Sequence, residues 1–169
     1  MEEEIRHKIL DFLESTIEKQ REEFANLPVC PFAKAERTSG RLQLDYFNVA
    51  SQDICGLVSN MINAGDESGL YVVKENDEFV ELNGDRDTIR FANFLKKELK
   101  SGGLKDYTII CFNPNDTVSA GEYNVRSEFP YLMINVAKTN VLHDSQKNLQ
   151  KTKYYDKFTK QYKKMLGIK

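Results

Sequence analysis

The sequence predicts an α/β or α+β domain, with a single sheet of about four to five strands, helices packed on it and helices at both ends. Two near-continuous apolar runs, residues 107–113 and 131–137, are typical of interior strands covered on both faces. Apolar residues recur at helical spacing in residues 2–25, 54–62 and 85–103. Helices and strands alternate along the chain, which favours one sheet with helices packed against it.

The length and composition favour one domain, residues 1–169. The 169 residues are 40% hydrophobic and 30% charged, which suffices for one core and is short for two. There is no internal repeat and no low-complexity linker that would divide the chain.

The first half begins with an expected amphipathic helix over residues 2–25, ended by Pro28 and Pro31. Residues 41–49 alternate apolar and polar side chains, which predicts a strand. Residues 54–62 repeat apolar positions at helical spacing and predict a short helix.

Residues 69–75 are rich in β-branched and aromatic side chains and predict a second strand. Residues 76–82 fit a hairpin partner or a loop. The segment 85–103 starts with acidic residues, ends with lysines and a glycine pair, and predicts a helix. The tail, about residues 144–166, predicts one or two helices.

The charge gives no support for nucleic acid as a partner. The net charge is −2 and the pI is near 5.8, without the basic excess typical of nucleic-acid or anionic-membrane binding. The N-terminal segment is acidic and the C-terminal one basic. We interpret both as solvated helix faces, with a binding patch for phosphate or nucleic acid as the alternative.

Cysteine usage and the N-terminus indicate a cytoplasmic protein without a membrane segment. Cys30, Cys55 and Cys111 form no CxxC pair, and their odd number fits a reducing compartment. The start "MEEEIRHKIL" lacks the pattern of a secretory signal, and no apolar run approaches the ~20 residues of a membrane span.

Two long irregular segments, residues 26–41 and 113–130, are candidate sites because long loops in compact domains are often functional. The second directly follows an expected core strand, where ligands of open α/β sheets usually bind. Its candidate binding and proton-transfer residues are Asn113, Asn115, Glu122, Arg126 and Ser127.

Arg37 and Arg126 are candidates for holding an anion, because guanidinium groups bind carboxylate or phosphate with two parallel hydrogen bonds. The alternative is that each arginine pairs with a nearby acid, such as Glu36, Glu122 or Glu128, and fixes its own loop.

Cys30 is a candidate nucleophile or contact residue in the first irregular segment. Lys34 and Arg37 could lower its pKa if a short helix follows Pro31. The alternative is a small buried hydrophobic residue. Cys-Pro sequences can also present a thiolate to haem iron, but nothing else in the chain supports haem.

His143 could form a catalytic pair with Cys30, and either His143 or Glu122 could move protons. The alternative for His143 is a helix-capping turn with Asp144 and Ser145. The chain contains neither a metal-ligand motif nor a glycine-rich cofactor motif, so we expect no metal and no cofactor.

The motifs "VCPFAKAER" and "VRSEFPYLMINVA" resemble an uncharacterised bacterial domain family. Its members carry Leu-Cys-Pro-Phe-Ala after an N-terminal helix and Arg-Ser-Pro-aromatic-Pro before a late strand. The matching stretches here are 30–33 and 126–131, with Glu128 in place of a proline. The resemblance implies linked roles for Cys30 and Arg126 and names no reaction.

Two functional hypotheses follow. The first is a small enzyme or ligand-binding domain for a small anionic molecule, with the Cys30 loop and the Arg126 loop forming the pocket. The second is an interaction protein whose basic C-terminal tail, containing Tyr154, Tyr155 and Tyr162, binds a macromolecule. The sequence does not decide between them, and it leaves the oligomeric state open.

Overall fold

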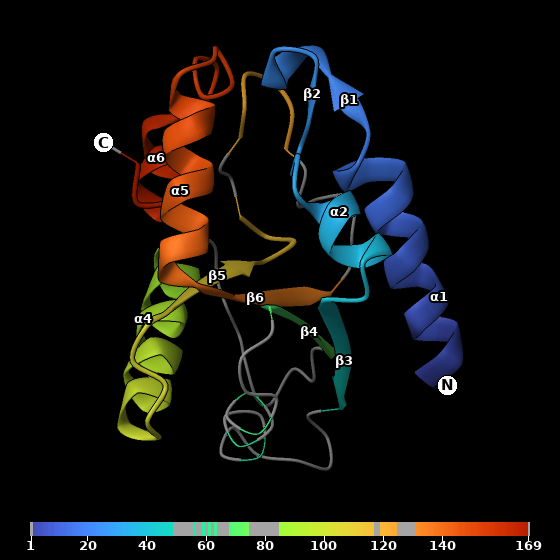
Figure 1. The fold of residues 1–169 in the computed structure, drawn as a ribbon, viewed down its shortest axis with the longest axis vertical. Coiled ribbons are helices and arrows are strands. Elements are labelled where there is room, and N and C mark those ends of the chain that lie inside the picture. The colour runs from blue at the N-terminus through green and yellow to red at the C-terminus, as the bar shows by residue number, and fades with distance from the viewer. Residues whose placement is uncertain are drawn as a thin grey trace.

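A four-stranded mixed sheet organises the fold (Figure 1). The computed structural model describes residues 2–48, 56, 59, 61, 63, 68–74, 85–116, 119–124 and 131–168. The strands are β3 (Leu42–Asn48), β4 (Ser68–Lys74), β5 (Tyr107–Phe112) and β6 (Leu132–Lys138), in the order β3-β4-β6-β5. β3 and β4 are parallel, and β6 runs antiparallel to β4 and β5. The predicted fold class is confirmed.

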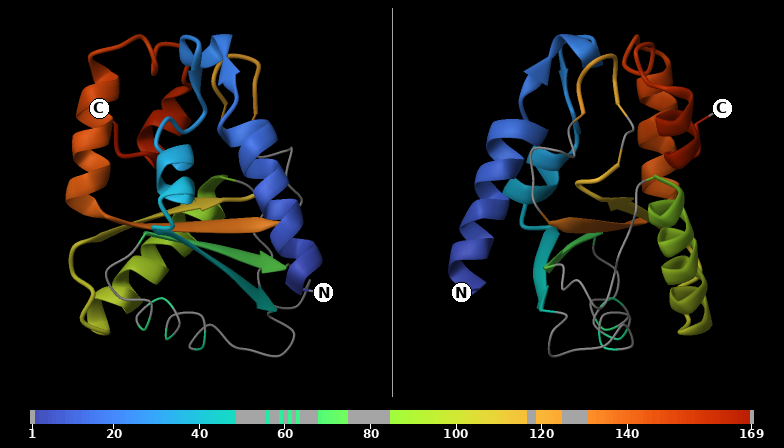
Figure 2. Two further views of the ribbon diagram at one scale, coloured as in Figure 1. Left: turned by 45° about the vertical axis from the view of Figure 1, so that its right-hand side comes forward. Right: turned by 180° about the vertical axis from the view of Figure 1, so that it is seen from behind.

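Helices cover both faces of this sheet (Figures 1 and 2). On one face lie α1 (Glu2–Phe12), α2 (Ala33–Thr38) and α5 (Thr139–Gln150), and on the other lies α4 (Asp85–Ser101). The alternation of side chains along each strand produces two cores. In β4, Leu70 and Val72 pack with α1, whereas Tyr71 packs with α4.

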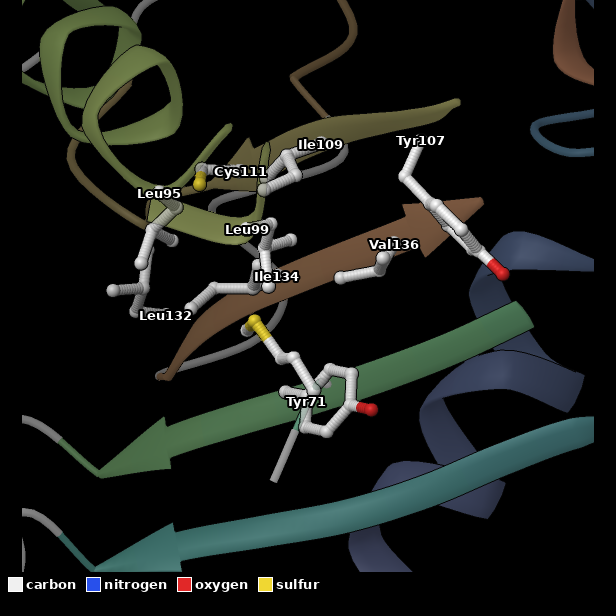
Figure 3. Packing of buried hydrophobic residues seen from close by; sticks show 10 residues of the cluster. Tyr71, Leu95, Leu99, Tyr107, Ile109, Cys111, Leu132, Ile134 and Val136 are labelled. Carbon is white, nitrogen blue, oxygen red and sulfur yellow. The ribbon is translucent and has the colours of Figure 1, made fainter. Parts of the chain in front are cut away.

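The core beneath α4 is continuous from helix to sheet. Leu95 and Leu99, four residues apart and buried, meet Ile134 of β6 and Cys111 of β5 (Figure 3). The helix ends where predicted, since Gly103 adopts a left-handed conformation with φ of 102° and Leu104 N–H bonds to the Leu99 carbonyl.

The first helix is shorter than the predicted range 2–25. α1 continues into a π-helical turn, η1 (Leu13–Ile17), and then the chain reverses. A two-stranded ribbon follows, with β1 (Gln20–Arg21) antiparallel to β2 (Leu27–Pro28) around the short helix η2 (Glu22–Phe24). The predicted single sheet is therefore accompanied by this ribbon. The reversal places Phe24 in a separate core, which is rich in aromatic side chains, instead of on the apolar face of α1.

That aromatic core joins the N-terminal ribbon to the C-terminal tail. Phe24 is fully buried and its ring contacts those of Tyr123, Tyr154 and Phe158. The tail consists of α5, a turn segment and α6 (Lys160–Met165), so the prediction of one or two helices is confirmed as two. Burial of the rings explains why the two chain ends pack together.

Two predicted elements lie partly or wholly outside the described residues. Of the expected helix 54–62, Gly56, Ser59 and Met61 are described and helical, whereas residues 76–82 lie outside. In the part of the chain that the structure describes, no helix combines the length and apolar character that crossing a bilayer requires.

Candidate functional site

A cavity of about 260 Å³ lies between the sheet and the terminal segments of the chain. Its floor is the sheet face that carries Leu70, Ile110, Asn135 and Ala137. One wall consists of Phe12, Leu13 and Ile17. A second consists of residues 29–32, which we call the Cys30 segment, together with α2. The third is formed by α5 and the C-terminal tyrosines. Figure 2 shows these elements facing one another above the sheet.

Two exposed apolar side chains mark the open side of the cavity. Phe32 at the start of α2 is 38% exposed and Val141 in the first turn of α5 is 51% exposed, and both line the cavity. Their position indicates an entrance between α2 and α5.

The π-helical turn positions the Cys30 segment. The Glu18 N–H bonds to the Leu13 carbonyl, and the helix ends at Ile17. The Ile17 carbonyl is therefore free to accept the Cys30 N–H at 3.1 Å. The Tyr154 hydroxyl donates to the Val29 carbonyl from the other side. The segment is thus tied to both chain ends.

Arg37 fixes α2 to the same turn. Its Nε and Nη2 donate to the two carboxylate oxygens of Glu18 at 2.7 and 2.9 Å, and Nη1 lies 2.7 Å from Glu14 Oε1. The partners are therefore acids of the first helical segment, not Glu36. Two carboxylates already neutralise Arg37, so an added anion would compete with both.

The surroundings of Cys30 keep its sulfur protonated. Burial raises the pKa of the Cys30 thiol, the backbone N–H groups of Phe32 and Ala33 oppose that rise, and the charges of Glu18 and Glu36 add to it. A short helix does follow Pro31, as the sequence indicated, but acids rather than Lys34 and Arg37 dominate the charge around the sulfur. Cys30 therefore suits contact with a ligand better than nucleophilic attack.

Tyr155 brings a second polar group to the cavity. The side chain is 8% exposed and its ring packs edge-on against Tyr154 and Phe158. Burial, then the nearby Cys30 and Tyr162, raise the pKa of Tyr155 to about 12. Among the residues that the structure describes, none forms a hydrogen bond with the Tyr155 hydroxyl.

Asn135 places a carboxamide on the otherwise apolar floor. It pairs across the sheet with Leu70 on one side and Ile110 on the other, and all three line the cavity. No described residue bonds to its side-chain amide. Gln146 of α5 is also buried, and its Nε2 donates to the Leu166 carbonyl at 2.8 Å.

The cavity carries almost no charge. Glu36 is the one charged side chain among the described residues that line it, and its carboxylate accepts two hydrogen bonds from Arg41 at 2.9 and 3.2 Å. No lysine or arginine is part of this lining.

Asn113 and Asn115 lie elsewhere, where β5 ends beside α4. Asn113 is fully buried, its Nδ2 donates to Thr88 Oγ1 at 3.3 Å and its Oδ1 accepts the Asn115 N–H at 3.1 Å. Thr88 Oγ1 in turn donates to Asp116 at 2.7 Å. This buried network anchors the loop after β5 to α4, so both asparagines act on loop structure there.

Glu122 and His143 do not join Cys30 at the cavity. Glu122 is exposed in a turn that packs on the C-terminal tail, and His143 is exposed on α5. Neither lines the cavity. Arg126 and Ser127 lie outside the described residues.

The tyrosines of the second hypothesis are not on the surface. Tyr154 and Tyr162 are each 4% exposed and belong to the aromatic core with Tyr155. They cannot form an aromatic contact surface without unfolding the tail, so only exposed lysines remain for that role.

The sequence reasoning missed Asn135 and the cavity use of Tyr155. Asn135 did leave a signal, because it interrupts the apolar run 131–137 of an interior strand. Tyr155 left none, since its burial depends on the fold of the tail.

Comparison with known proteins adds no assignment: no family model, curated protein or solved structure matches the chain. Over the described ranges, histidine, cysteine and acidic side chains form no group of three or more that could hold a metal ion.

Proposed function

We propose that this protein is a small-molecule-binding domain whose ligand is mainly apolar and uncharged, held in the cavity between the sheet and the terminal segments. One observation carries the proposal: the cavity is lined by aliphatic and aromatic side chains with a few polar groups, the usual character of a ligand site.

The size of the cavity defines the size of the ligand. An apolar cavity of ~150 Å³ can hold benzene, so 260 Å³ has room for roughly ten non-hydrogen atoms, and somewhat more through the open side. A bound apolar molecule would cover apolar lining that otherwise meets water through the open side, and would thereby stabilise the fold.

The lining supports binding more than catalysis, and a neutral ligand more than an anion. Cys30 is held as a thiol, and the candidate proton-transfer residues His143 and Glu122 lie away from the cavity. An ionised ligand would lose its hydration on entering the cavity, and the described lining contains no cation to pair with it. That transfer is unfavourable. The anionic ligand expected from the sequence depends on Arg126, outside the described residues.

The test is to fill the cavity from its floor. Ala137 faces the cavity from β6 next to α5, so Ala137→Leu places three further carbon atoms in the space that a ligand would use. Naphthalene serves as the probe, with binding followed by saturation-transfer NMR. We expect wild-type protein to bind it, and Ala137→Leu to lose at least tenfold in affinity without a lower melting temperature.

A matched control is Ala35→Leu, which adds the same side chain at an exposed position of α2 that does not line the cavity. This variant should bind naphthalene as the wild type does. Absence of naphthalene binding in the wild type, or unchanged binding in Ala137→Leu, would overturn the proposal.

A further inference from the structure

Two polar residues of the cavity lining, Tyr155 and Cys30, indicate how the ligand is oriented. We propose that the Tyr155 hydroxyl and the Cys30 thiol donate hydrogen bonds to an uncharged acceptor on the ligand, such as the carbonyl oxygen of a ketone, ester or amide. This inference rests on the proposed function and names the chemical class of the ligand.

The Tyr155 hydroxyl is the first of the two proposed donors. The residue is 8% exposed and lines the cavity, its hydroxyl forms no hydrogen bond with a described residue, and the hydroxyl is not among the fully enclosed polar atoms. A hydroxyl that is open to a mostly apolar cavity and has no protein partner is available to hydrogen-bond a ligand or water.

The neighbouring tyrosine shows the contrast. Tyr154 also lines the cavity, but it donates its proton to the Val29 carbonyl and thereby holds the Cys30 segment. Of these two adjacent phenols, one therefore has a structural bond and the other is available to a ligand.

The Cys30 thiol is the second proposed donor. Cys30 lines the same cavity, and its thiol lies close enough to Tyr155 for its charge, when ionised, to raise the pKa of that phenol. The thiol and the phenol both stay protonated at neutral pH, since burial raises the pKa of each. Both groups can donate, and neither is positively charged.

Two protonated donors without a cation favour an oxygen that accepts hydrogen bonds and carries no charge. A carboxylate would meet the donors but would find no cation in the described lining, and it would lie near the repulsive charges of Glu18 and Glu36. A hydrocarbon would leave the donors unsatisfied. A neutral carbonyl meets both requirements.

Three probes of similar shape separate these cases: naphthalene, 2-acetylnaphthalene and 2-naphthoate. In wild-type protein the ketone should bind about three- to tenfold more tightly than naphthalene, the range expected for a hydrogen bond to a neutral acceptor. In Tyr155→Phe this preference should fall, and in the double variant Tyr155→Phe/Cys30→Ala it should fall to about one, while naphthalene affinity stays unchanged in Tyr155→Phe. Tyr107→Phe, which removes a phenol hydroxyl from the core beneath α4 and away from the cavity lining, is the matched control and should retain the preference.

Equal affinity for ketone and naphthalene in the wild type, or an unchanged preference in Tyr155→Phe, would overturn the inference and leave the proposed function standing. Tightest binding of 2-naphthoate would overturn the neutral class. Failure of the wild type to bind naphthalene would overturn the proposed function itself.

Discussion

Arg37 and Glu18 form a bidentate ion pair. The pair joins α2, which carries Arg37, to the end of the π-helical turn, which Glu18 directly follows. Nε and Nη2 of the guanidinium meet Oε1 and Oε2 of the carboxylate at 2.7 and 2.9 Å, and the Glu18 side chain is only 7% exposed. The pair lies next to the cavity wall formed by Ile17 and Cys30. It therefore maintains the site without contacting a ligand.

Removal of this pair should loosen the fold. Arg37→Met leaves the nearly buried carboxylate of Glu18 without its partner, which is more costly than losing an exposed pair. We expect a clearly lower urea midpoint, measured by circular dichroism. Arg37→Lys should restore only part of the loss, because an ammonium cannot make the paired contacts.

Arg41→Met is the control, since Arg41 makes the same kind of pair with Glu36 but is 58% exposed. Its effect should be small. Equal midpoints for the Arg37 and Arg41 variants would contradict the structural role of Arg37.

Cys30 should behave as a partly accessible but unactivated thiol. Because burial raises the pKa of Cys30, its alkylation rate in the folded protein should be low at pH 7 and should still be rising above about pH 8.5, where the rate of a free thiol begins to level off. Cys111, 1% exposed in the core beneath α4, should react only on unfolding. Mass spectrometry after timed alkylation assigns each site. Fast reaction of Cys30 at pH 7 would instead indicate an activated nucleophile.

Stability should fall at alkaline pH, with a sign fixed by the raised pKa values of Cys30 and Tyr155. Below the unfolded-state pKa both states keep the thiol proton. Above about pH 8.5 the unfolded chain releases it first, so the free energy of unfolding drops by up to about 1.4 kcal/mol per pH unit. The loss continues until the folded-state pKa is reached.

Urea titrations at several values between pH 7 and 10 measure this slope. Cys30→Ala should make the fall shallower over the interval in which the unfolded thiol titrates. Parallel curves for the wild type and Cys30→Ala would show that the folded thiol ionises as it does in the unfolded chain.

The C-terminal tail should be essential for folding. Phe158 is 6% exposed and its ring stacks on Tyr162 at 4.5 Å between centroids and contacts Phe24 at 5.2 Å. Phe158→Ala should cost about 3–5 kcal/mol, and deletion of residues 151–169 should abolish cooperative unfolding. Lys153→Ala, at an exposed position of the same segment, should change little. A stable deletion variant would favour a tail that serves only as a binding arm.

The sheet was predictable because its signals are local. The apolar runs of β5 and β6 and the spacing of Leu95 and Leu99 in α4 arise from burial on both faces of one sheet. The end of the first helix was not predictable in this way. Phe24 continues the helical spacing, yet its ring is buried against residues about 100 or more positions later, and that gain outweighs local helix propensity.

The candidate site was predicted only in part. Cys30 lies in the cavity because Pro31 and the short helix after it turn the chain, which the sequence shows. The partners of Arg37 and the availability of the Tyr155 hydroxyl depend on packing between the two chain ends. Sequence spacing carries no information about such contacts.

Protection of Cys30 by a bound probe tests the central claim most directly. The alkylation rate of Cys30 by N-ethylmaleimide would be measured with and without saturating 2-acetylnaphthalene, with sites assigned by mass spectrometry. If the ligand occupies the cavity, the rate should fall several-fold in the wild type and remain unchanged in Ala137→Leu. Saturable probe binding that leaves the Cys30 rate unchanged would show that the molecule binds elsewhere and would contradict the account.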